Sequence, residues 1–145
     1  MYLWKWEKIQ KVLRKINLIC VGNLKKEYLK NLERNYLSDI NLIVIKESNK
    51  EIESNEILKI LNRFKEKFCV LFDLKGKPAN YYANRISNEF YKGLNVFFIV
   101  GGSYGVNYNL SKNCDLVLKI SDFTYSHQIF RISSILFIRK ILFNL

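Results

Sequence analysis

The sequence predicts a single layered α/β domain, in which a mostly parallel five-stranded sheet has helices on both faces. Five short apolar runs indicate the strands, and helical patterns separate them. The runs are continuously apolar rather than alternating, which is typical of strands buried on both faces of a parallel sheet. Such an alternation of strands and helices implies right-handed crossovers and a layered arrangement.

The predicted strands are rich in Ile, Val, Leu and Phe, and they are Ile16–Val21, Ile40–Ile45, Phe68–Phe72, Val96–Val100 and Leu116–Ile120. A chain of 145 residues is long enough for one domain with a single core. It contains only one proline and six glycines, which leaves no flexible linker. We therefore expect residues 15–145 to form one domain.

Helical periodicity fills the gaps between these strands. Apolar residues share one face in each of three helices, namely Leu24, Tyr28, Leu29 and Leu32, then Ile57, Ile60, Leu61 and Phe64, then Tyr82, Ile86 and Phe90. Ser48 and Glu51 are spaced as a capping box for the second helix. Gly93 is expected to end the third helix. A last helix, opened by His127, is apolar nearly all round from Ile129 to Phe143, which favours a dimer interface.

The composition is strongly basic, with a net charge of +11 and a pI near 9.6. Such a charge suggests a polyanionic partner, either RNA or an anionic membrane. The alternative is a lysine bias inherited from an AT-rich genome, because Lys, Asn, Ile, Tyr and Phe are all abundant. An apolar fraction of 49% excludes wholesale disorder.

The three cysteines, Cys20, Cys69 and Cys114, are far apart and form no C-x-x-C pattern. Cys20 and Cys69 lie inside apolar strands and are expected to be packed thiols. No disulfide framework is indicated, so the reducing cytoplasm fits best. One histidine excludes a histidine-rich metal centre. Charged residues interrupt the apolar C-terminal stretch, so no membrane span is expected.

Residues 1–14 form a basic N-terminal extension with an amphipathic pattern. Its apolar stripe consists of Tyr2, Trp6, Ile9 and Leu13. Its basic residues, which lie largely off that stripe, are Lys5, Lys8, Lys11 and Arg14. Such a helix can pack its aromatic residues onto the domain or a twin subunit, contact RNA, or lie on a membrane. We favour these interpretations in that order.

Four motif segments follow one another along the chain. They are V-G-N-L-K at 21–25, F-D-L-K-G-K at 72–77, F-I-V-G-G-S-Y-G at 98–105 and S-D-F-T-Y-S-H-Q-I-F-R at 121–131. Each segment begins at or near the end of a predicted strand, which is where open α/β sheets usually bind ligands.

With these segments in register over residues 15 to about 135, the chain resembles the rRNA large subunit (pseudouridine-N3) methyltransferase H family of small SPOUT-class enzymes. The resemblance implies a trefoil-knotted α/β fold, which physical patterns would not propose, since true knots are rare. It also implies a homodimer that uses S-adenosyl-L-methionine to methylate N3 of a pseudouridine in 23S (large-subunit) ribosomal RNA. The expected partner is ribosomal RNA in assembled ribosomes, and no metal is needed.

Cofactor-contacting positions carried over from the resemblance are Phe72, Gly101, Ile120, Ser121, Asp122, Phe123, Thr124 and Tyr125. Glycine at a strand end lets the backbone approach a ligand closely. Phe72 and Ile120 are apolar and are suited to sandwich an adenine ring. The alternative for Gly101 and Gly102 is an ordinary tight turn, since the G-x-G-x-x-G dinucleotide spacing is absent.

Two residues are candidate catalytic bases, because a uracil-type N3–H must lose its proton during methylation. His127 is the first, although a histidine at a helix N-terminus often only caps or orients the backbone. Asp73 is the second, and its alternative is a loop aspartate that satisfies backbone N–H groups. Arg131 is a candidate for contact with substrate RNA, and it can equally pair with an acid.

The chain also departs from the family pattern. Ser126 stands where the family has proline, and L-F-I-R-K-I at 136–141 stands where its last helix has E-Q-x-Y-R-A. The family's C-terminal Tyr-His tail has no counterpart before Leu145. These departures leave an alternative open, a diverged and catalytically inactive ribosome- or RNA-binding protein. A small-molecule-binding α/β domain unrelated to RNA is a third hypothesis.

Overall fold

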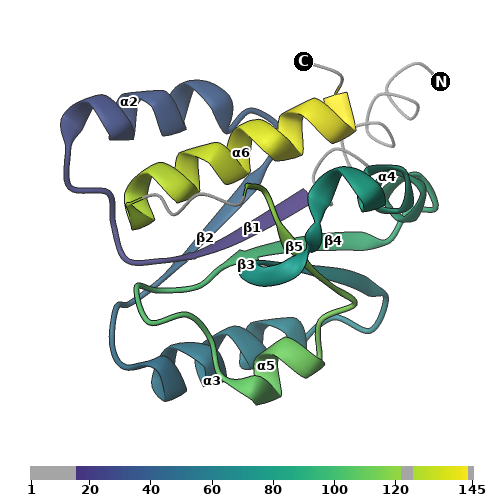
Figure 1. Cartoon of the computed structure of the whole chain (residues 1–145), viewed down its shortest axis with the longest axis horizontal. Coiled ribbons are helices and arrows are strands. Elements are labelled where there is room, and N and C mark those ends of the chain that lie inside the picture. Colours follow the sequence, from purple (N-terminus) through teal and green to yellow (C-terminus); the bar gives the residue numbers. More distant parts are fainter. Residues whose placement is uncertain (1–15, 122–125, 144–145) are drawn as a thin grey trace, which may run out of the picture.

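A computed structural model describes residues 16–121 and 126–143, which fold around one sheet (Figure 1). Its elements in chain order are β1 (Ile16–Val21), α2 (Glu27–Tyr36), β2 (Asn41–Ile45), α3 (Lys50–Leu61), β3 (Lys67–Pro78), the 3-10 helix η1 (Ala79–Tyr82), α4 (Ala83–Tyr91), β4 (Asn95–Val100), α5 (Tyr108–Lys112), β5 (Leu116–Lys119) and α6 (His127–Phe143). The N-terminal extension lies outside the described residues.

The five strands form one sheet in the order β2-β1-β4-β3-β5, and every neighbouring pair is parallel. Ile19 in β1 is opposite Ile43 in β2 on one side and opposite Ile99 in β4 on the other. The carboxyl ends of all strands therefore meet at one edge of the sheet. The predicted fold class, a layered α/β domain with a five-stranded parallel sheet, is confirmed.

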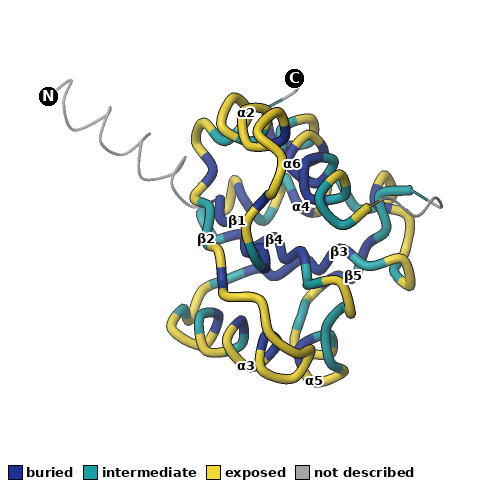
Figure 2. The backbone as a smooth tube through the Cα atoms, turned by 90° about the vertical axis from the view of Figure 1, so that its left-hand side faces the viewer, coloured by how far each residue is buried: buried dark blue, intermediate teal, exposed yellow. Residues whose placement is uncertain are grey.

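Helices cover both faces of the sheet. Figure 1 shows α2 and α6 on one side and α3 and α5 on the other. Ile86 of α4 and Ile138 of α6 belong to one buried cluster, while Ile57 of α3 and Leu110 of α5 belong to the opposite one. The strands between these layers are largely buried in Figure 2. Burial on both faces explains why the strand sequences are continuously apolar.

Strand β3 departs from a regular ladder at the carboxyl edge. Phe72 and Lys77 both pair with Leu118 of β5, so residues 73–76 bulge out of the sheet. Gly76 holds this bulge against β5, because a Cβ there would lie 2.5 Å from the backbone nitrogen of Leu118. The predicted strand Phe68–Phe72 is therefore only the first part of β3, and the bulge places Asp73 beside the candidate site.

Two local predictions about helix ends have different outcomes. Gly93, at φ 92°, follows the end of α4 as predicted. The capping box for α3 is wrong, because Asn49 is the N-cap and its side chain accepts a hydrogen bond from the Ile52 N–H at 2.9 Å. Ser48 instead donates its backbone N–H to the Glu53 carboxylate at 2.7 Å.

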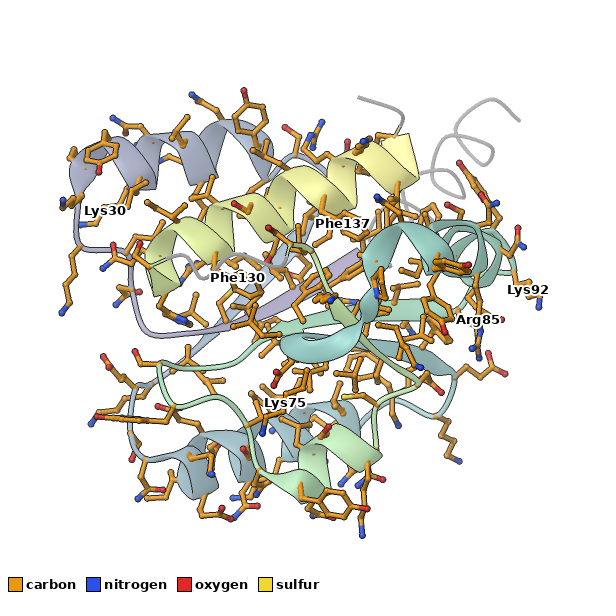
Figure 3. The ribbon with its side chains drawn as sticks, in the orientation of Figure 1. Lys30, Lys75, Arg85, Lys92, Phe130 and Phe137 are labelled. Carbon is orange, nitrogen blue, oxygen red and sulfur yellow. The ribbon has the colours of Figure 1, made fainter. Side chains whose placement is uncertain are left out.

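The last helix packs within the chain more than its composition suggested. It lies between α2 and α4, and Figure 3 shows Phe130 and Phe137 on its sheet-facing side. Phe137 meets Phe72 edge-on, with ring centroids 5.7 Å apart. The nearly all-round apolar pattern, from which a dimer interface was expected, is therefore explained mostly by burial within the chain. Only Ile129 and Leu136 stay substantially exposed among its large apolar residues, at 44% each, within the described part of the helix.

The described helices include none that is long and apolar enough to cross a membrane. Cys20 and Cys69 are buried thiols, as predicted. Burial raises the pKa of both thiols to about 12. Neither side chain is therefore a thiolate nucleophile near neutral pH.

Candidate functional site

Two adjoining cavities lie at the carboxyl edge of the sheet. The first, which we name the glycine cavity, has a volume of about 410 Å³ and is lined by Leu71, Phe72, Asp73, Leu74, Gly101, Gly102, Ser103, Gly105, Val106, His127 and Phe130. The second, which we name the lysine cavity, has a volume of about 300 Å³ and is lined by Val21, Gly22, Asn23, Lys25, Lys26, Tyr28, Leu29, Glu47, Gly102, Ser103, Ser126, His127, Gln128 and Ile129. The residues common to both linings, Gly102, Ser103 and His127, are the shared wall.

A tight turn after β4 forms one wall of the glycine cavity. The Gly105 N–H donates to the Gly102 carbonyl at 2.9 Å, and Gly105 has a φ of 77° that favours glycine. A Cβ on Gly101 would lie 2.7 Å from Val106 Cγ1, so the turn packs on itself at that point. The predicted tight turn is therefore present, and it also forms a cavity wall. Leu71, Val106 and Phe130 make the remaining surface largely apolar.

Phe72 and Ile120 were expected to sandwich an adenine ring. Phe72 lines the glycine cavity, but its ring is stacked on Phe98 at 5.8 Å and is almost fully buried. Ile120 packs against the buried cluster beneath α6. Ser121 is described but is not part of either lining. The positions Asp122, Phe123, Thr124 and Tyr125 lie outside the described residues.

The lysine cavity is built on the turn after β1. Gly22 adopts a φ of 73°, and its N–H donates to the Ile45 carbonyl of β2 at 2.9 Å. The start of α6 is bonded to the same turn, because the Lys25 N–H donates to Gln128 Oε1 at 3.0 Å. Lys25 and Lys26 precede α2 and are exposed, so this cavity has a basic rim.

Arg131 does not face solvent, and its predicted contact with RNA is wrong. The side chain is 3% exposed, and its guanidinium donates to both carboxylate oxygens of Glu33, at 2.6 and 3.1 Å. A third bond runs to the Gly22 carbonyl at 2.7 Å. Arg131 thus pairs with an acid, which was the other expectation. It attaches α6 to α2 and supports the turn beneath the lysine cavity.

His127 is placed on the shared wall rather than used as a cap. Ser126 caps α6, since its side-chain oxygen accepts from the Ile129 N–H at 3.4 Å and its carbonyl accepts from the Phe130 N–H at 2.9 Å. Burial, and then the nearby Arg131 charge, lower the pKa of His127 below 6.5, and Glu47 and Glu53 oppose this shift. The imidazole is therefore neutral near pH 7 and able to accept a proton.

Asp73 combines both roles that were expected of it. Its Oδ1 accepts the Lys75 backbone N–H at 2.9 Å, as in an Asx turn. It also lines the glycine cavity, although it is absent from the lining of the lysine cavity. Of the two candidate bases, only His127 faces both cavities. Across the residues that the structure describes, no group of three or more His, Cys, Asp or Glu side chains could hold a metal ion.

Sequence reasoning missed two contributors to the site. Glu53 is buried at 3% exposure directly behind Gly102, yet the helical pattern around it is ordinary. The Val106 side chain packs so closely on Gly101 that it leaves no room for a Cβ there. Neither has a local signal, because their positions depend on how α3 and the turn after β4 meet. The sequence motif includes Lys25 but does not indicate a role for it. The only sequence signal for a basic cavity rim is the pair Lys25 and Lys26 close to Gly22.

Comparison with known proteins gives a consistent result. The family model described as "Predicted SPOUT methyltransferase" matches residues 14–136. "Ribosomal RNA large subunit methyltransferase H" of Fusobacterium nucleatum is 35% identical over 136 residues, covering 81% of this chain and 86% of that protein. The protein of the same name from Caldicellulosiruptor saccharolyticus is 32% identical over 133 residues, with the same coverage. A solved TrmH/SpoU tRNA modifying enzyme of A. aeolicus has a TM-score of 0.46 and 11% identity, covering 97% of this chain and 87% of that one, which is too distant to support a conclusion.

Proposed function

The chain belongs to the SPOUT methyltransferase family, and we propose that it methylates N3 of a pseudouridine in 23S ribosomal RNA, with S-adenosyl-L-methionine as the methyl donor. The observation that carries this proposal is the shared wall, where His127 stands between two cavities of different character. Relatives named for large-subunit rRNA methylation match this chain over 81% of its length, which supports RNA as the substrate. As part of the same proposal, the fold contains a trefoil knot, and the protein acts in the cytoplasm on assembled ribosomes.

The glycine cavity suits the methyl donor. Its volume of about 410 Å³ lies within the range of small-ligand sites, and its walls are mostly apolar with backbone groups exposed at the turn. Phe72 and Gly101, both expected as cofactor positions, line it. When bound, S-adenosyl-L-methionine supplies an electrophilic methyl group on a positively charged sulfur.

The lysine cavity suits the acceptor nucleotide. Lys25 and Lys26 on its rim would meet phosphates, which dominate the affinity of proteins for nucleic acids. A nucleobase that enters this cavity would reach the junction with the glycine cavity, beside Gly102, Ser103 and His127. Direct transfer requires the methyl group and N3 to meet at this junction, and holding both reactants there contributes much of the catalysis because it removes the entropy cost of their encounter.

His127 then acts as the base. The neutral imidazole would accept the N3–H proton of the acceptor as the methyl group passes from the donor's sulfur to N3. The methyl–sulfur bond would break, the sulfur would leave as a neutral thioether, and the proton would later pass to solvent. Arg131 helps to keep His127 neutral beforehand by lowering its pKa. Asp73 is the weaker candidate, because its carboxylate is held by the Lys75 N–H and lines only the glycine cavity.

Mass spectrometry of 23S rRNA from cells with and without the gene tests this function. We expect N3-methylpseudouridine only when the gene is present, and we expect a gene encoding His127→Ala to restore little of it. A gene with the exposed substitution Glu56→Gln serves as the matched control and should restore it fully. Identical methylation patterns with and without the gene would favour the catalytically inactive RNA-binding alternative.

We also propose that the protein works as a homodimer through the outer face of α2 and α6. Tyr28 is 58% exposed, and Leu32 and Tyr36 follow it along α2 as exposed apolar residues. Tyr28 and Ile129 line the same cavity, and Arg139 bonds to the Tyr36 carbonyl at 3.2 Å, so the exposed faces of the two helices adjoin. An apolar surface shared by two helices next to the acceptor cavity suits a second copy of the chain.

Light scattering on a Leu136→Glu variant tests the dimer. We expect the parent protein to be a dimer at micromolar concentration and the variant to be a monomer with unchanged circular dichroism. Tyr108→Glu, on α5 across the sheet and 80% exposed in the parent, is the matched control and should remain a dimer. A monomeric parent would contradict this part of the proposal.

A further inference from the structure

Glu53 is a buried carboxylate that the proposed reaction does not yet use. It lies in the first turn of α3 at 3% exposure, and its Oε2 accepts the Ser48 N–H at 2.7 Å. Its Oε1 is buried and has no hydrogen-bond partner among the residues that the structure describes. A buried oxygen left without a donor costs free energy, so its presence at this position calls for a physical reason.

The unpaired oxygen is directed at the shared wall. A Cβ built on Gly102 would overlap Glu53 Oε1 and would lie 3.1 Å from its carboxyl carbon. The carboxylate therefore sits immediately behind Gly102, which lines both cavities. Its charge also acts on His127 in this wall, since Glu53 is one of the carboxylates that oppose the lowering of the His127 pKa.

Two neighbours of Glu53 on α3 hold the segment that follows the glycine turn. Ser54 Oγ accepts the Asn107 N–H at 2.9 Å, and Glu51 accepts the side-chain amide of Asn107, the N-cap of α5, at 3.0 Å. A neutral residue of the same shape at position 53 would keep these contacts. The feature that Glu53 adds is a negative charge at the place where ligands from the two cavities would meet.

We propose that Glu53 is a specificity-determining residue, whose buried carboxylate favours a cationic methyl donor over its neutral product at the shared wall. This inference rests on the proposed function. A sulfonium in the glycine cavity would be attracted to the carboxylate through a low-dielectric wall, where charge–charge interactions are strong. Once the methyl group has been transferred, the sulfur is neutral and this attraction is lost, so the spent cofactor is released more readily.

Isothermal titration of S-adenosylmethionine and S-adenosylhomocysteine tests the proposal. Glu53→Gln keeps the shape and removes the charge, so the dissociation constant for S-adenosylmethionine should rise about tenfold, and that for S-adenosylhomocysteine less than about twofold. Glu56→Gln removes the same charge from an exposed position on α3 and should change neither constant. Glu53→Gln should unfold at the same temperature as the parent or a higher one, since a buried charge is removed.

Glu53→Asp provides a second variant in case the amide disturbs folding. It keeps the charge but withdraws it by one methylene, so we expect a smaller loss of selectivity in the same direction. Equal weakening of both ligands by Glu53→Gln would show that Glu53 only shapes the turn and would overturn the inference alone. If the parent protein binds neither ligand, the proposed function fails and this inference fails with it.

Discussion

The two cavities at the carboxyl edge differ in the character of their linings. The glycine cavity is lined by apolar side chains and by a turn so tight that a methyl group on Gly101 would collide with Val106. The lysine cavity is bordered by charged groups, with Lys25 and Lys26 on its rim and Glu47 in its lining. We therefore expect shape to control what enters the first cavity and charge to control what approaches the second.

Because of this difference, the two cavities should tolerate different substitutions. A shape-selective site is sensitive to one added methyl group and insensitive to salt, because packed interiors do not yield to extra volume. A charge-selective site tolerates changes of shape but weakens as ionic strength rises. The shared wall lines both cavities. Substitutions in the wall should therefore change the rate of methyl transfer more than the affinity for either ligand.

The largest effect is expected at His127. His127→Ala should lower the rate of methyl transfer by roughly 10²- to 10⁴-fold, the usual contribution of a positioned base, with little change in cofactor affinity. In the parent, the rate should fall as pH drops through the lowered pKa of His127, below 6.5, because the protonated imidazole cannot accept a proton. Rates measured against pH should lose this acid limb in the variant. A limb that persists would assign the base to another group, and Asp73→Asn would then be the next variant.

The next largest effect is expected at Arg131, which supports the lysine cavity from below. Arg131→Met leaves the Glu33 carboxylate with only 12% side-chain exposure and no partner from α6, so unfolding should become easier by about 3–5 kcal/mol. Urea denaturation measures this change. Replacing Glu33 as well, in Arg131→Met with Glu33→Gln, should restore part of the lost stability. Additive losses in the double variant would contradict the coupling of the pair.

A smaller effect is expected where the glycine cavity is tightest. Gly101→Ala should weaken cofactor binding by roughly tenfold to a hundredfold, the cost of overpacking by one methyl group. Val106→Ala alone should have little effect, but it removes the Cγ1 atom that the new methyl would meet at 2.7 Å. Calorimetry should therefore show partial recovery in the double variant. No recovery would mean that Gly101 is required for close approach to the ligand itself.

The smallest effect is expected on the rim of the lysine cavity. Lys25→Ala with Lys26→Ala should weaken RNA binding several-fold and should make its salt dependence shallower by about one unit for each phosphate that is no longer neutralised. Lys59→Ala with Lys92→Ala removes the same charge from exposed positions on α3 and just after α4. Binding measured across a salt series separates the two pairs. If both change the slope equally, only the net charge matters and the rim has no special role.

The elements with a local signal could be predicted from the sequence. Continuous apolar runs located β1, β2, β4 and β5 to within one residue at each end, because burial on both faces demands such runs. Gly93 and His127 marked the end of α4 and the start of α6, because helix termini have specific backbone and hydrogen-bonding needs. The motif order was enough to identify the family.

The tertiary structure decided everything that depends on residues far apart in the chain. Arg131 was equally suited to a phosphate or an acid, and only the packing of α6 on α2 brought Glu33, 98 positions away, to its guanidinium. The bulge that presents Asp73 arises because Phe72 and Lys77 share one partner on β5. Nothing in the sequence distinguishes Glu53 from other helical acids, and only the packing of α3 brings its carboxylate behind Gly102. Local periodicity specifies which face of an element is buried, but which charge it meets there is set by the neighbour that covers it.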